Sequence, residues 1–125
     1  MRKGIESVYK EIGSEGCYFF CLLHICGVSE NFILRWYDKL IEKGLMTTDC
    51  YIKDAPGIIK AITGETVKFS KTETRPEDKE NRYIINEWYN PRTKYTHFAM
   101  DNFDPLTSSV TEKEGYIRSY RVIEF

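Results

Sequence analysis

Histidine is scarce in this chain, with only two residues, at positions 24 and 97 of 125. No charge of one sign dominates, because 18 Lys and Arg residues face 19 Asp and Glu residues, for a formal net charge of −1. This balance removes the electrostatic basis for binding nucleic acid or an anionic membrane surface. The scarcity of histidine leaves very few candidates for a general base at neutral pH.

Long apolar runs are also absent, since none reaches the roughly 18 residues that cross a bilayer. The first six residues carry Arg2 and Lys3 but no long apolar core follows, so we expect no secretion signal and a cytoplasmic location. The chain has neither a glycine-rich phosphate loop nor a Gly-x-Ser-x-Gly elbow. We therefore expect no nucleotide, metal or other cofactor.

Hydrophobic residues make up 42% of the chain and aromatic residues 14%, which is enough for a real core. No repeat or shift in composition marks a boundary, so residues 1–125 are predicted to form a single domain. Apolar spacing changes from a helical period to a strand-like one near Gly64. Helices followed by an antiparallel sheet form an α+β fold. Helices are predicted at 3–12, 17–26, 29–43 and 54–64, and strands at 66–69, 82–89, 96–100 and 116–125.

Two residues with reactive side chains lie at the start of two of these elements. Cys17 follows a glycine and opens an apolar helical stretch, and His97 lies at the start of a short strand-like run. A thiol needs a base and positive potential to become a nucleophile at neutral pH. The start of a helix supplies part of that potential, and an imidazole held by a third polar group supplies the base.

This order of elements resembles the papain-like cysteine peptidases, and most closely the small bacterial and phage domains related to bacteriocin-leader peptidases. The likeness is carried by Gly16-Cys17 with its apolar helix and by the run from His97 through Asp104 to Leu106. The whole chain also resembles a short family found on phage and prophage-like elements. The resemblance implies a papain-like fold, in which N-terminal helices, with a central helix starting at the cysteine, pack on a C-terminal antiparallel sheet.

The same resemblance implies a role for each matching residue. Cys17 would be the nucleophile, His97 the general base and later acid, and Asp104 the group that orients the imidazole, with Asp101 and Asn102 as alternates. The substrate would be an amide in a peptide, an isopeptide or a peptidoglycan cross-bridge. We expect the thiol and the imidazole to approach within about 4 Å, in an open groove between helix and sheet.

The chain departs from the family pattern just before the cysteine. Such peptidases place a Gln or Asn there to donate into the oxyanion hole, whereas this chain offers Glu11, Ser14 and Glu15. An ionised carboxylate cannot donate a hydrogen bond, so Ser14 and backbone N–H groups are the remaining candidates. The departure favours a second class of function, in which a catalytically weak or inactive relative acts as a binding or inhibitory protein of a mobile element. Either class implies a peptide or protein partner.

The cysteines also allow simpler interpretations. Cys17 at the start of a buried helix is compatible with a plain core residue. Cys17, Cys21 and His24 share a helix face, with Cys26 nearby, and zinc accepts such ligands. Ligands along one helix converge poorly without a partner turn, so we expect no zinc. Close spacing on one helix also disfavours disulfides among these cysteines.

Overall fold

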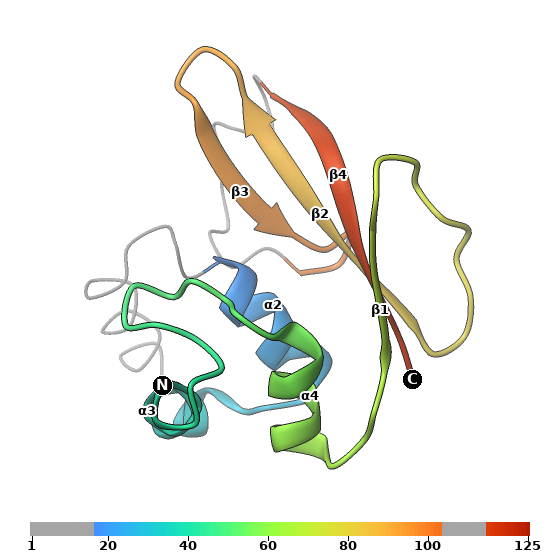
Figure 1. Ribbon diagram of the computed structural model, residues 1–125. Coiled ribbons are helices and arrows are strands. Elements are labelled where there is room, and N and C mark those ends of the chain that lie inside the picture. Colours follow the sequence, from blue (N-terminus) through green and yellow to red (C-terminus); the bar gives the residue numbers. More distant parts are fainter. Residues whose placement is uncertain (1–16, 104–114) are drawn as a thin grey trace.

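The computed structural model describes residues 17–103 and 115–125, and in these ranges three α-helices pack on a four-stranded antiparallel sheet (Figure 1). The predicted α+β class is therefore confirmed, while the helix expected at 3–12 lies outside the described residues. The helices are α2 (Cys17–Ile25), α3 (Ile33–Glu42) and α4 (Ala55–Thr63), with a 3-10 turn, η2 (Glu30–Phe32), before α3. The strands are β1 (Lys68–Thr72), β2 (Arg82–Asn90), β3 (Tyr95–Ala99) and β4 (Tyr116–Glu124).

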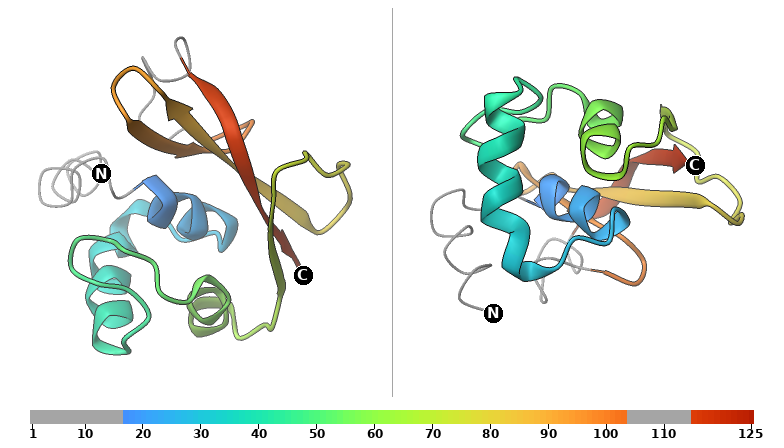
Figure 2. Two further views of the ribbon diagram at one scale, coloured as in Figure 1. Left: turned by 45° about the horizontal axis from the view of Figure 1, so that its top comes forward. Right: turned by 90° about the horizontal axis from the view of Figure 1, so that it is seen from below.

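Helix α2 is the central helix of the fold. Six of its nine residues are buried, which follows from a sequence that is apolar nearly all round. The helix packs against β3 and α4. The left view of Figure 2 shows it between α3 and the sheet. The predicted buried central helix is thus confirmed.

The flanking helices show which local signals set their boundaries. Asp54 accepts a hydrogen bond from the Gly57 N–H and caps α4, and Gly64 ends that helix in the left-handed conformation with φ of 82°. The helix predicted from residue 29 begins later, because the Ser29 side chain makes no capping hydrogen bond. The chain turns there through η2, and the regular α-helix begins only at Ile33.

The sheet has the strand order β1-β4-β2-β3, which places β3 at one edge. Strands β2 and β3 form a hairpin, in which Trp88 lies opposite His97 and Glu87 lies opposite Phe98. The pairing of β2 with β4 shifts register between Glu87 and Trp88. Such a bulge adds a residue to one strand and bends the ladder at that point.

Among the described residues, no single helix is both long and apolar enough to cross a membrane. Helix α2 and residues 30–42 reach the required length and composition only as a pair bent by 120°.

Helix α3 offers a matched test of core packing. Leu40 is 0% exposed and Leu34 on the same helix is 43% exposed. We expect Leu40→Ala to lower the free energy of unfolding by about 2–5 kcal/mol, because it removes buried methyl groups and leaves a cavity. We expect Leu34→Ala to change it by about 0.5 kcal/mol or less. Urea unfolding followed by circular dichroism measures both, and equal losses would contradict this packing of α3.

Candidate functional site

The structure brings the cysteine and the histidine of the sequence analysis into contact. Cys17 Sγ lies 3.3 Å from His97 Nδ1, although the two residues are 80 positions apart in the chain. Cys17 is the first residue of α2 and therefore lies at the positive end of the helix dipole. His97 is the middle residue of β3. The distance is that of a hydrogen bond involving sulfur.

The contact arises at the edge of the sheet. Successive side chains of a strand point to opposite faces, so His97 and Phe98 lie on opposite sides of β3. Phe98 faces the helices and stacks on Tyr18, with ring centroids 4.8 Å apart. Because β3 is an edge strand, the first residue of α2 can reach His97 on the other side.

The pair is buried, and the expected open groove around it is wrong. Cys17 is 1% exposed and His97 is 0% exposed. The first residue of α2 already lies within the packed interior, so the thiol does not face solvent as the start of a surface helix would. Any reaction of Cys17 with another molecule therefore requires the groups that cover the pair to move aside.

The group that orients His97 has to approach its Nε2, because Nδ1 faces the thiol. Asp101, one of the two alternates, accepts hydrogen bonds from Asn86 and Arg75 through its two carboxylate oxygens, each at 2.9 Å. Asn102 is exposed in the turn after β3. Asp104 and Ser14, the predicted third member and oxyanion donor, lie outside the described residues.

The other candidate metal ligands point to separate partners. Cys21 Sγ lies 3.8 Å from the Phe98 carbonyl oxygen, and His24 is exposed and stacks on the Phe103 ring at 4.0 Å. Cys26 is half-buried, and its burial raises the pKa of its thiol to about 11. Within the described ranges, no three His, Cys, Asp or Glu side chains converge as metal ligands would. None of the four cysteines forms a disulfide in the part of the chain that the structure describes.

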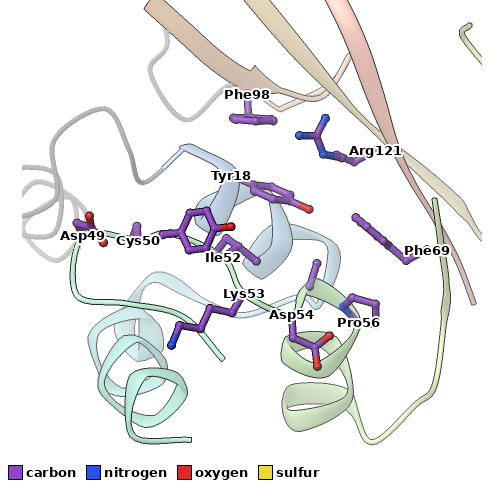
Figure 3. A pocket seen from close by; sticks show the side chains of 12 residues that line it. Tyr18, Asp49, Cys50, Ile52, Lys53, Asp54, Pro56, Phe69, Phe98 and Arg121 are labelled. Carbon is purple, nitrogen blue, oxygen red and sulfur yellow. The ribbon is translucent and has the colours of Figure 1, made fainter. Parts of the chain in front are cut away.

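A groove of about 620 Å³ lies on the helix-covered side of β3 (Figure 3). One wall is formed by residues 49–56 and the other by the sheet, through side chains that include Phe69 and Arg121. Tyr18 and Phe98 also line it, and these residues directly follow Cys17 and His97 in the chain. This groove has no local signal in the sequence, because its lining comes from segments far apart in the chain.

The charged cluster beside this groove is centred on Glu87, a buried carboxylate of β2. Glu87 accepts hydrogen bonds from Ser119 and Arg118, and from Arg121 Nη1 at 2.8 Å. Burial by itself raises the pKa of Glu87, but the hydrogen bonds from Ser119, Arg118 and Arg121 and the charge of Arg121 reverse this and lower it from 4.5 to about 2. Two guanidinium groups and one carboxylate leave this cluster with one net positive charge.

Tyr18 is part of the same environment. Its burial raises the pKa of the phenol to about 12, although the guanidinium of Arg121 opposes this shift through its charge and a hydrogen bond. Tyr18 is therefore neutral throughout the physiological range. The guanidinium of Arg121 lies over two rings of the groove wall, 5.8 Å from the centroid of Tyr18 and 5.3 Å from that of Phe98.

The model of a family described as "Protein of unknown function, DUF261" matches residues 1–125. No curated protein and no solved structure matches the chain.

The low pKa of Glu87 leads to a prediction for acid stability. A carboxyl whose pKa falls on folding stabilises the fold above its unfolded pKa, and this contribution is lost as the pH falls from about 4.5 towards 2. We expect the native chain to lose stability steeply over this interval and Glu87→Gln to lose less of it. Thermal unfolding across this pH range measures the difference, with Glu80→Gln in an exposed loop as the control. Identical acid dependence in Glu87→Gln and the native chain would contradict the assignment.

Proposed function

The chain belongs to the DUF261 family, and we propose that it is a cysteine hydrolase-like protein that cleaves an amide with Cys17 as nucleophile and His97 as base. The observation that carries the proposal is the 3.3 Å contact between Cys17 Sγ and His97 Nδ1. A thiol beside an imidazole and at a helix start has both features that activate cysteine nucleophiles.

The arrangement of elements supports a papain-like version of this chemistry. A cysteine begins the central helix, a histidine lies on an edge strand of the following antiparallel sheet, and the two side chains meet where helix and strand pack together. This is the order for which the sequence resembles the small bacterial and phage relatives of bacteriocin-leader peptidases. The proposed substrate is an amide in a peptide, an isopeptide or a peptidoglycan cross-bridge.

The chemistry runs in two steps. In the first, the Cys17 thiolate attacks the carbonyl carbon of the amide, the C–N bond breaks, and His97 gives its proton to the leaving amine. This step leaves a thioester on Cys17. In the second, His97 takes a proton from a water molecule, whose oxygen attacks the thioester carbonyl, and the carboxylic acid leaves as the thiol is restored. The backbone N–H of Cys17 and Ser14 are the proposed donors to the oxyanion, with Asp104 as the proposed partner of His97.

A second candidate function is a non-catalytic binding or inhibitory protein that keeps the fold of this hydrolase. Two observations favour it: the buried state of Cys17 and His97, and the carboxylates of Glu11 and Glu15 ahead of the cysteine. Loss of a single oxyanion donor costs about 10²–10³ in rate. In this case Cys17 and His97 would join α2 to β3 as structural residues.

Reactivity of the thiols separates the two functions. We expect iodoacetamide near pH 6 to modify Cys17 before the other cysteines, because the imidazolium and the helix start favour its thiolate. Cys26 is the internal control, since it is more exposed than Cys17 but its pKa is raised to about 11. Peptide mass mapping over time gives the rate at each cysteine.

Two substitutions test the source of this reactivity. His97→Ala is expected to slow the modification of Cys17 at pH 6 by at least about tenfold, and His97→Gln keeps a polar side chain of comparable size as the folding control. Asp104→Ala is expected to slow it less, since this residue orients the ring and does not itself move the proton. The hydrolase proposal would be contradicted if Cys17 reacted no faster than Cys26 and if neither His97 variant changed that rate. The binding protein would then be the better account.

A further inference from the structure

The groove beside β3 has the size and the lining of a ligand-binding site. Its volume of about 620 Å³ falls in the range of roughly 300–1,000 Å³ that small-molecule and cofactor sites occupy. Aromatic side chains line much of it, with Tyr18 and Phe98 at one end and Phe69 on the sheet wall. Tyr51 on the opposite wall is 67% exposed, so it offers an unpartnered apolar surface to a ligand.

The groove adjoins the proposed catalytic pair without containing it. Cys17 and His97 do not line it, but Tyr18 and Phe98, their direct neighbours in the chain, do. Stacking of these two rings joins the start of α2 to β3 at the end of the groove.

The sheet wall presents a positive charge in a poorly hydrated position. Arg121 has a side chain that is only 14% exposed, and its Nη1 donates to Glu87 at 2.8 Å and to Ser119 at 2.9 Å. Glu87 is shared with Arg118, so one carboxylate offsets two guanidinium groups. Because Arg118 lies over Tyr89 and does not line the groove, Arg121 carries the unbalanced charge to the groove wall.

The two carboxylates on the opposite wall accept hydrogen bonds from groups in their own segment. Asp54 uses its carboxylate to cap α4 through the Gly57 N–H, and Asp49 accepts a hydrogen bond from Thr47 in its own turn. Lys53 adds a further positive charge to this wall. Figure 3 shows the two acids across the groove from Arg121. The groove therefore has acidic groups on the loop wall and a held guanidinium on the sheet wall.

We propose that the groove binds a peptide segment with an acidic side chain, whose carboxylate pairs with Arg121 while its apolar neighbours pack on Tyr51 and Phe69. The assignment of this peptide segment to the substrate rests on the proposed function. Arginine suits the role because its planar guanidinium has several N–H donors, so it can bind the peptide carboxylate while it also donates to Glu87. The low exposure of Arg121 strengthens that pairing relative to a surface lysine.

The test measures binding in a chain that cannot turn substrate over. The probes are two blocked peptides, acetyl-Ala-Leu-Glu-Phe-Ala-amide and the same peptide with Gln in place of Glu, titrated into the Cys17→Ala variant. We expect the Glu peptide to bind about tenfold more tightly than the Gln peptide, as one charged hydrogen-bonded pair provides. Backbone amide shifts in nuclear magnetic resonance spectra should change at Ile52, Phe69 and Phe98.

Matched arginine variants identify the responsible charge. Arg121→Met keeps an apolar stem of similar length and is expected to abolish the preference for Glu. Arg118→Met leaves Arg121 on the groove wall but offset by Glu87 alone, and it is expected to weaken the preference without abolishing it. Arg121→Lys serves where Arg121→Met does not fold, and it should weaken the preference and make it more sensitive to salt.

Several results would overturn the proposal. These are equal affinity for the two peptides, no binding of either at millimolar concentration, or a preference that Arg121→Met and Arg121→Lys both retain. Shifts at the groove that appear with protein concentration alone would assign it to a second copy of the chain instead. If neither peptide binds as expected but Cys17 is alkylated quickly, the hydrolase proposal stands and the acidic-peptide substrate is rejected. Acidic-peptide binding with an unreactive Cys17 would instead support a binding protein that uses this groove.

Discussion

The packing of α2 against β3 is the contact on which the candidate site depends. It joins the first helix of the described chain to the edge strand of the sheet, and it does so through three neighbouring contacts. Tyr18 stacks on Phe98, Cys21 contacts the Phe98 carbonyl oxygen, and Cys17 meets His97. Because these contacts come from adjacent turns of one helix and adjacent residues of one strand, a shift of the helix along β3 would break all three together.

The sheet supplies the charge that the helix lacks. Helix α2 contains no Lys, Arg, Asp or Glu, so the charged groups of this region come from β2 and β4. Glu87 holds Arg118 and Arg121 beside the register shift of these strands, where a regular ladder would set different neighbours. One network thus fixes the strands together and leaves a guanidinium on the wall of the groove. Glu87 therefore ties β2 to β4 and also fixes the position of Arg121 on the groove wall.

Sequence reasoning found what local signals determine. Helix α2 is apolar nearly all round, Asp54 and Gly64 follow rules for helix ends, and the approach of Cys17 to His97 was expected from the resemblance to papain-like peptidases. Features that depend on contacts between several segments could not be predicted in this way. The burial of Cys17 depends on the tertiary packing around the start of α2, which the local sequence does not determine. The contact of Glu87 with two arginines depends on strand register, which no single segment encodes.

The central claim is that Cys17 is a nucleophile and not only a packing residue, and p-nitrophenyl acetate tests this most directly. This activated ester is small, and its attack by a thiolate leaves an acetyl group on sulfur and releases p-nitrophenol. Intact-mass measurement with peptide mapping follows the acetyl group with time. The account predicts rapid acetylation at Cys17, its subsequent hydrolysis in the native chain, and loss of both in His97→Gln. Acetylation that is no faster at Cys17 than at Cys26, or that His97→Gln leaves unchanged, would contradict it.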